Sequence, residues 1–181
     1  MRETGENKMK EAVVTLPSDT EVLVTRGFEA PANLVWRAYV EPELFRRWCG
    51  SSPGWSMPVC EMDMRVGGQY RWRWRNDENG QEFGFNGEFL EVVEHAKLVH
   101  TQIFDAGNLG VSMGGEPSII TVTFAGSDGI TNVATTIKYA SKADRDEALE
   151  TGMTDGMEMN YTLLEDVLST IGNTAAAPKL D

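Results

Sequence analysis

The amino-acid sequence predicts an α+β protein in which a run of antiparallel strands is followed by one long C-terminal helix. From Ser56 onward, the hydrophobic pattern has a period of two for about eighty residues, which is typical of strands. From Ser141 to Ile171, apolar residues recur every three or four positions, which indicates a helix. Because the strands follow one another without helices between them, the pattern favours an antiparallel meander.

The first third of the chain predicts one strand and then two short helices. Residues 21–29, EVLVTRGFE, alternate so that Val22 and Val24 share one face. Pro31 stands where the first turn of a helix begins, a position that proline favours. Pro42 begins a second short helix, PELFRRW, which ends close to a glycine.

The middle of the chain predicts the main sheet. In YRWRWR, Tyr70, Trp72 and Trp74 alternate with arginines, and Asn79-Gly80 then gives a hairpin signal. Further strands are predicted for EFGFNGEFLEVV, KLVHTQIFD, SIITVTFA and ITNVATTIKYA.

The last element is predicted as one continuous helix. Ser141 and Asp144 resemble a capping box, with Asp in place of the usual Glu or Gln. The apolar stripe of this helix comprises Leu149, Met153, Met157, Tyr161, Leu164, Leu168 and Ile171.

Two glycines, Gly152 and Gly156, lie beside this stripe, and each costs about 1 kcal/mol relative to alanine inside a helix. Two interpretations stay open. The glycines allow the helix to pack closely against a strand, or they leave space for a ligand beside Met153 and Met157, whose side chains adapt to irregular shapes.

Composition limits the classes of protein to which the chain can belong. Its 181 residues are 41% hydrophobic, which suits one domain, and we expect this domain at 11–171, between a mobile tail at 1–10 and a C-terminal tail at 172–181. The net charge of −12 argues against nucleic-acid binding. No apolar run is long enough for a membrane helix, the N-terminus lacks a signal-peptide pattern, and two cysteines provide no disulfide framework. We therefore expect a cytoplasmic protein.

Several segments together resemble a known family. TRGFEAPANLVWRAYVEPELFRRW, DMRVGGQYRWRW, FNGEFLEVV and SKADRDEALETGMTDGMEMNYTLLEDVL are similar to the activator-of-heat-shock-protein-ATPase homologue family (AHSA1-like) of the START-like, or SRPBCC (polyketide cyclase-like), superfamily. The resemblance implies a helix-grip fold, in which a curved antiparallel sheet wraps around the C-terminal helix and leaves a cavity between them. No catalytic signature accompanies these segments.

The leading functional hypothesis is therefore a small-molecule binding protein that holds an apolar or amphipathic ligand in this cavity, without a cofactor. The expected contacts are Trp72, Trp74, Phe85, Met153, Met157 and Tyr161. They would form a mostly apolar pocket with a few polar tips. The alternative, left open here, is that these side chains only fill the core.

A second hypothesis is an enzyme of the cyclase or hydrolase type that uses the same cavity. His100 is the one weak candidate for a general base, because no oriented nucleophile accompanies it. Glu61 and Asp63 share a strand face that is expected to face water. His95 and His100 fall on opposite faces of a strand, so no metal site is expected. The chain is therefore expected not to be an enzyme.

A third hypothesis, a chaperone-associated module, is weakened because the short C-terminal tail leaves no room for a second domain. Arg71, Arg73 and Arg75 are expected on the outer face of the sheet, paired with acidic neighbours, although an anion site is the alternative. A homodimer through the sheet edge or the outer face is left open.

Overall fold

A computed structural model of the chain describes residues 10–110 and 115–175. It contains one eight-stranded antiparallel sheet with the order β1-β2-β8-β7-β6-β5-β4-β3. The strands are β1 (Val13–Thr15), β2 (Glu21–Phe28), β3 (Trp55–Met62), β4 (Gln69–Asn76), β5 (Glu82–Val93), β6 (Lys97–Asp105), β7 (Ser118–Ser127) and β8 (Ile130–Lys138). The helices are α1 (Ala32–Val40), α2 (Pro42–Cys49), α3 (Lys142–Glu150) and α4 (Met153–Ala175). The predicted antiparallel arrangement of the strands is confirmed.

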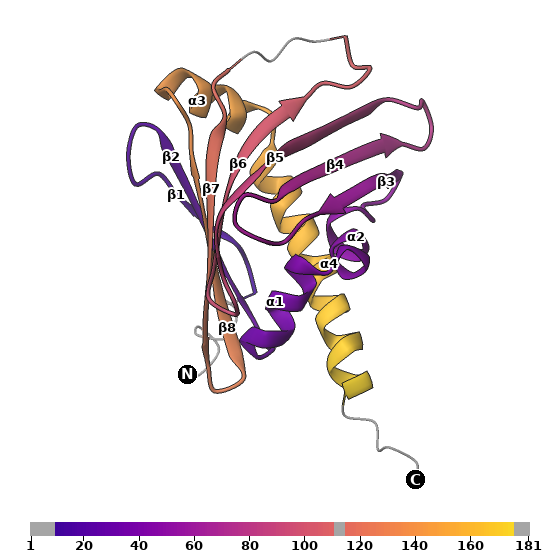
Figure 1. The fold of residues 1–181 in the computed structure, drawn as a ribbon, viewed down its shortest axis with the longest axis vertical. Coiled ribbons are helices and arrows are strands. Elements are labelled where there is room, and N and C mark those ends of the chain that lie inside the picture. The colour runs from indigo at the N-terminus through magenta and orange to yellow at the C-terminus, as the bar shows by residue number, and fades with distance from the viewer. Residues whose placement is uncertain (1–9, 111–114, 176–181) are drawn as a thin grey trace.

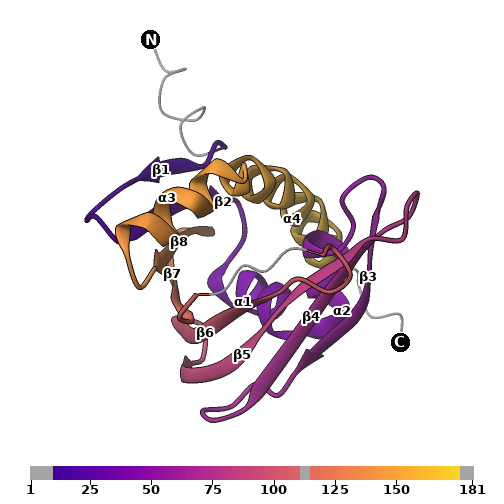
Figure 2. The same ribbon diagram turned by 90° about the horizontal axis from the view of Figure 1, so that it is seen from above.

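The sheet curves around the long helix α4, as the helix-grip fold requires (Figure 1). Viewed from above, α4 runs along the open side of the curve, and α1 and α2 lie inside it (Figure 2). Helix α4 packs against α1, α2, α3 and β2. The curved sheet therefore presents a concave face toward the helices and a convex face on the other side.

Two glycines of β5 allow the strand to bend. A Cβ atom at Gly84 would collide with the carbonyl oxygen of Trp72, and one at Gly87 would collide with that of Thr101. Only glycine permits this close approach of neighbouring strands. The pairing of β5 with β6 also shifts register after Phe89, and such irregularities increase local twist and curvature.

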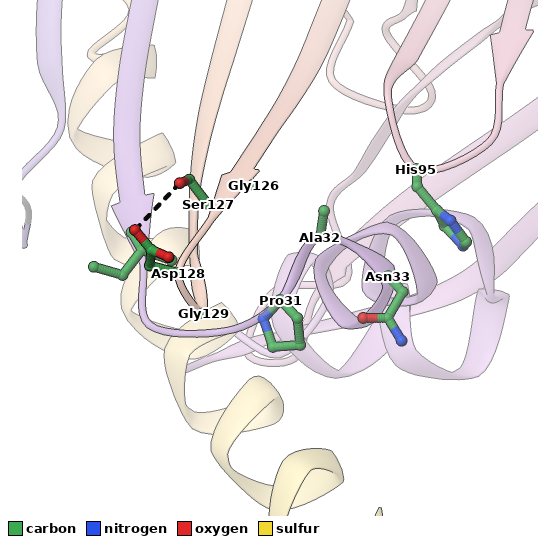
Figure 3. A pocket seen from close by; sticks show the side chains of 9 residues that line it. Pro31, Ala32, Asn33, His95, Gly126, Ser127, Asp128 and Gly129 are labelled. Carbon is green, nitrogen blue, oxygen red and sulfur yellow. Dashed lines mark hydrogen bonds between the residues drawn. The ribbon is translucent and has the colours of Figure 1, made fainter.

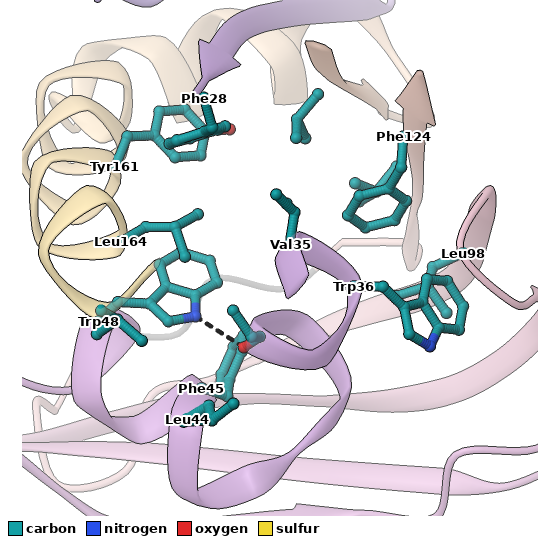
Figure 4. Packing of buried hydrophobic residues seen from close by; sticks show 14 of the residues in the cluster. Phe28, Val35, Trp36, Leu44, Phe45, Trp48, Leu98, Phe124, Tyr161 and Leu164 are labelled. Carbon is teal, nitrogen blue, oxygen red and sulfur yellow. Dashed lines mark hydrogen bonds between the residues drawn. The ribbon is translucent and has the colours of Figure 1, made fainter. Parts of the chain in front are cut away.

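The short helices begin as the sequence predicts. Pro31 is the N-cap of α1, and Pro42 is the first residue of α2, where its missing N–H leaves no helical hydrogen bond unmade. The two helices are joined by a hydrogen bond of 2.8 Å from the indole N–H of Trp48 to the carbonyl oxygen of Ala38 (Figure 4).

The expected single C-terminal helix is wrong, because it is divided in two. The side chain of Ser141 caps α3 by accepting a hydrogen bond from the backbone N–H of Asp144, as predicted. Gly152 then adopts a φ of 78°, in the left-handed region that ends helices, and α4 begins at the next residue. The sequence pattern does not reveal this break, because the apolar spacing continues across it.

Helix α4 continues to Ala175, so the expected domain boundary at residue 172 falls inside its last turn. Residues 1–9 of the expected tail at 1–10, and residues 176–181 of the expected tail at 172–181, lie outside the described residues. Within the described residues, no helix is long and apolar enough to cross a membrane.

The hydrophobic core fills the space between the concave face and helices α1, α2 and α4 (Figure 4). Its members include Phe28, Val35, Trp36, Phe45, Trp48, Phe124, Tyr161 and Leu164. One charged residue of β2 also points to this side. Arg26 is 3% exposed, and its guanidinium lies 2.7 Å from Glu165 and 3.8 Å from Glu158, both on α4. This ion-pair network connects α4 to β2.

Candidate ligand-binding site

Five aromatic side chains share the concave face of strands β4, β5 and β6. The register places Trp72 opposite Phe85, Trp74 opposite Phe83, and Phe85 opposite Phe104. Directly paired residues of antiparallel strands point to the same side, so all five belong to one face. We call these five residues the concave aromatic array. Trp72 stacks on Phe45 of α2, and α2 lies inside the curve of the sheet, so the array is on the concave face.

Four rings of the array, those of Trp74, Phe83, Phe85 and Phe104, form a continuous chain of contacts. Trp74 and Phe83 lie nearly parallel, with 5.4 Å between ring centroids and 15° between planes. Phe104 continues the chain, 6.2 Å from Phe83 and 5.6 Å from Phe85. All of these side chains remain partly exposed, although they lie on the face that elsewhere forms the core.

The inner end of the array lies against α2. Trp72 stacks on Phe45 at 4.6 Å and contacts Tyr70 at 4.2 Å. The indole N–H of Trp74 donates a hydrogen bond of 2.8 Å to the carbonyl oxygen of Cys49, which holds the ring in place. The indole nitrogen of Trp72 is buried, and it has no hydrogen-bond partner among the described residues.

Two of the expected ligand contacts, Met153 and Met157, lie on helix α4. Met153 and Met157 are partly exposed and pack against the core, and the hydroxyl of Tyr139 donates to the sulfur of Met153 over 3.3 Å. One turn from Gly156, Asn160 contacts the sulfur of Cys49 at 3.9 Å. The expected contacts Met153 and Met157 therefore stand at the N-terminal end of α4.

The structure answers the question that the two glycines raise. A Cβ atom at Gly156 would meet no other atom within 4 Å, and the same holds at Gly152. The close-packing interpretation is therefore wrong for both. Gly152 serves to end α3, and Gly156 lies at an exposed position of α4.

Tyr161 occupies a different environment from the other expected ligand contacts. It is 3% exposed, its ring packs edge-on against Phe28 at 5.6 Å, and its hydroxyl lies 3.4 Å from the Thr135 hydroxyl. Burial raises the pKa of this phenol. Tyr161 thus belongs to the core between α4 and strands β2 and β8, because it lies two turns deeper along the helix than Met153.

His100 lies on β6, next to the inner end of the array. Its Nδ1 atom is 3.1 Å from the hydroxyl oxygen of Tyr70 and 3.1 Å from the carbonyl oxygen of Thr101. The Tyr70 hydroxyl donates to that same carbonyl over 2.7 Å, so it accepts from His100, and Nδ1 carries the proton.

Burial lowers the pKa of His100 to about 4, with a smaller opposing effect of the Thr101 hydrogen bond, and burial raises the pKa of Tyr70. His100 is therefore neutral near pH 7 and a weak base. Catalytic groups work best with a pKa near the operating pH, and neither group of this pair has one.

The remaining sequence candidates lie apart from the array. Glu61 and Asp63 are exposed, as predicted, and His95 is exposed in a turn with a φ of 62°. Within residues 10–110 and 115–175, no three His, Cys, Asp or Glu side chains are grouped to hold a metal ion.

The arginines of β4 point away from the array, and acidic residues pair with two of them. Arg73 contacts Glu82 at 3.2 Å and Asp105 at 2.6 Å, and Arg75 lies 3.9 Å from Glu82. The interpretation of an outer face with ion pairs is confirmed for these two residues.

A separate surface hollow of about 320 Å³ lies at the N-terminus of α1 (Figure 3). It is lined by Pro31, Ala32, Asn33, His95 and residues 126–130 of the β7–β8 turn. None of the sequence-predicted ligand contacts lines it. Its walls are largely loop backbone and small or polar side chains.

Sequence reasoning missed Phe104 as part of this site. Phe104 shares its parity with His100 in the strand KLVHTQIFD, which was the available signal. Its contact with the array depends on the pairing of β5 with β6, which the sequence pattern does not specify.

Comparison with protein families gives a match over most of this fold. The model of the family described as "Activator of Hsp90 ATPase homolog 1-like protein", AHSA1, matches residues 29–169. The chain belongs to the AHSA1 family. The match includes α1, the concave aromatic array and most of α4.

Solved structures show the same fold. A protein from Rhodobacter sphaeroides is 25% identical, with a TM-score of 0.79 over 88% of this chain and 99% of that one. A protein from Mycobacterium smegmatis is 22% identical, with a TM-score of 0.77 over 87% of this chain and 96% of that one. A protein from Nitrosomonas europaea is 25% identical, with a TM-score of 0.73 over 87% and 99%.

A comparison with curated proteins found no match. Membership in the AHSA1 family points to two roles, ligand binding or a co-chaperone-like role, and it singles out no ligand.

Proposed function

We propose that the chain binds an apolar or amphipathic small molecule between the concave face of the sheet and the N-terminal half of α4. The concave aromatic array forms one wall, and Met153 and Met157 form the other. The supporting observation is the partial exposure of the array on the face that is otherwise core.

This exposure is unfavourable unless something else covers the rings. Full burial of a large apolar side chain contributes about 1.5–3 kcal/mol relative to exposure. The neighbouring rings of Tyr70 and Phe89, on the same strands, are 2% and 1% exposed. The fold therefore covers one part of the aromatic surface and leaves the adjacent part open, which is the arrangement of a ligand site lined by apolar side chains.

The charges near the site favour a neutral ligand over an anion. Helix α4 contains no lysine or arginine, and it carries Asp155 and Glu158 in its first two turns. The two basic residues of α3, Lys142 and Arg145, are both bound to Asp146. With a net charge of −12, the protein as a whole repels anions.

The experiment uses N-phenyl-1-naphthylamine, a neutral probe whose fluorescence increases in apolar surroundings. We expect Phe104→Ala and Phe85→Ala to weaken probe binding by about tenfold, since loss of one buried ring contact of about 1.4 kcal/mol corresponds to that factor. Ile103→Ala is the matched control, because Ile103 adjoins Phe104 in sequence, is 43% exposed, and points to the convex face.

The anionic analogue 1-anilinonaphthalene-8-sulfonate has the same ring skeleton and should bind more weakly than the neutral probe. Equal effects of Phe104→Ala and Ile103→Ala would place the probe elsewhere and contradict the proposal. Native mass spectrometry of gently purified protein would then identify the class of any ligand that co-purifies.

A further inference from the structure

We infer that two copies of this chain associate face to face through the convex side of the sheet, about a two-fold axis that runs parallel to the strands between β6 and β7. The inference is independent of the proposed ligand site, which lies on the concave side. It is carried by exposed apolar residues of the convex face, by two charged residues that flank them, and by the symmetry that relates these charges.

The centre of the convex face carries exposed apolar side chains. Ile103 of β6 and Ile119 of β7 are 43% and 39% exposed, although both strands lie in the interior of the sheet. Ile119 is paired with Thr101, so Ile103 is its diagonal neighbour on the same face. Helices α1, α2 and α4 pack on the other side of the sheet, so these two isoleucines stay in contact with water (Figure 2).

The residues around the two isoleucines are uncharged and conformationally stiff. Outward-facing residues of β6, β7 and β8 form what we call the convex ridge, which comprises Val99, Thr101, Ile103, Ile119, Thr121, Thr123, Ala134 and Thr136. All but Ala134 are β-branched, so their χ1 angles are already restricted and little side-chain entropy is lost when they are covered. The ridge is therefore suited to association at low entropic cost.

One charged residue stands on each flank of the ridge. Lys138 of β8 is paired with Ile119, and the backbone N–H of Glu88 of β5 donates a hydrogen bond of 3.0 Å to the hydroxyl of Thr101. Across the face, the order is thus Lys138, Ile119, Thr101 and Glu88.

Both charges are available to a partner. Lys138 and Glu88 are exposed, and neither side chain has an ion-pair or hydrogen-bond partner in the part of the chain that the structure describes. Glu21 is the cross-strand neighbour of Lys138, but its carboxylate accepts a hydrogen bond of 2.8 Å from the hydroxyl of Ser18 instead.

The order of these residues is complementary to itself. A two-fold axis parallel to the strands exchanges the two flanks, so Lys138 of each copy lies opposite Glu88 of the other, and Ile119 lies opposite Thr101. Two-fold interfaces require such self-complementary surfaces, and sheets that pack face to face keep their strands within about 30° of each other. The charge pattern therefore selects a second copy of this chain as the partner.

The shape of the face agrees with this arrangement. Two convex surfaces first touch along their ridges, where the side chains are short, and the longer side chains of Lys138 and Glu88 can cross the wider gap on either side. Four strands at about 4.8 Å spacing and about 20 Å of strand length give about 400 Å² of each copy, or about 800 Å² in total. This area is at the low end for specific association, so we expect a dimer with a Kd in the micromolar range.

Sedimentation velocity over about 5–500 μM protein measures this dimer. A salt concentration of about 0.15 M limits the repulsion between two chains of charge −12. Ile119→Lys should raise the Kd by at least about tenfold, because it would bury two charges at the centre of the interface. Circular dichroism checks that this variant, like those below, keeps its fold.

An exchange of charges gives the sharper test. Lys138→Glu and Glu88→Lys each make both flanking contacts like-charged, and each alone should raise the Kd by about tenfold. An equimolar mixture of the two variants restores opposite charges at both contacts and should form a heterodimer with about the affinity of the wild type. Contacts within one chain cannot produce this rescue, because each chain in the mixture still carries one substitution.

Arg47→Glu is the matched control. Arg47 is exposed on α2, away from the convex ridge, and this substitution changes the net charge by the same amount as Lys138→Glu. It should leave the Kd unchanged. An equal effect of Arg47→Glu and Lys138→Glu would show that only net charge matters, and it would overturn the inference.

A wild-type protein that stays monomeric over the whole concentration range would also overturn the inference. A dimer that is insensitive to Ile119→Lys, or a mixture of the charge variants that shows no rescue, would place the interface elsewhere and overturn it as well. None of these outcomes bears on probe binding at the concave aromatic array, so the proposed function stands or falls separately.

Discussion

Replacing His100 with glutamine should remove a large part of the pH dependence of folding stability. His100 is 6% exposed, and burial lowers its pKa from 6.5 to about 4 in the folded protein. Below about pH 6.5, the unfolded chain binds a proton on this imidazole that the folded protein does not accept. Acidification therefore favours the unfolded state, and the full stability is present only above that pH.

The magnitude follows from the two pKa values. A shift of one pKa unit corresponds to about 1.4 kcal/mol, so the free energy of unfolding should fall by at most about 3 kcal/mol as the pH decreases from 6.5 to 4. Between about pH 7.5 and pH 5, the loss due to His100 is about 2 kcal/mol. The lowered pKa values of Asp105 and Asp146 act mainly below this interval.

Urea unfolding at these two pH values gives the loss of unfolding free energy on acidification for the wild type and for His100→Gln. The effect of His100 is the difference between these two losses. Glutamine retains a side-chain N–H that can donate to Tyr70, and it does not titrate. The wild type should lose about 2 kcal/mol more than the variant on acidification. Equal losses would show that His100 is not held as a neutral core histidine, and the hydrogen-bond assignment at Tyr70 would be refuted.

Two further predictions concern stability, both measured by urea unfolding. Gly156→Ala should stabilise the protein by about 0.5–1 kcal/mol, because the new Cβ meets open space inside a helix. Gly152→Ala should destabilise it by about 1–2 kcal/mol because of the positive φ, and effects of the same sign at the two glycines would contradict the helix break. Arg26→Met should lower the free energy of unfolding by about 2–4 kcal/mol. This is less than the loss of a fully buried ion pair, because Glu165 is 37% exposed. Glu165→Gln should lower it by about 1 kcal/mol. Similar stabilities of the wild type and Arg26→Met would show that this network does not anchor α4.

The sequence by itself determined the element order and the faces of most strands. The alternation around Val22 and Val24, and around Trp72 and Trp74, shows which residues share a face, because successive residues of a strand must point to opposite faces. Local signals also located the helix starts at Pro31 and at Ser141. These features depend only on neighbours along the chain, so a single sequence contains them.

Tertiary structure decided which of the inward-facing residues are buried. Tyr161 and Met153 belong to one apolar stripe, yet the first is enclosed by β2 and β8, and the second stays partly exposed at the end of α4. Spacing along a helix defines a direction, whereas burial depends on what the other strands place opposite it.

The polar details of the site were also decided by the fold. Arg26 interrupts an apolar face and is compensated only by carboxylates far along the chain, on α4. Trp72 and Trp74 look equivalent in YRWRWR, but only Trp74 reaches a carbonyl oxygen. A hydrogen bond requires an acceptor at a given distance and angle, and the position of that acceptor is set by how α2 packs on the curved sheet, which no local pattern encodes.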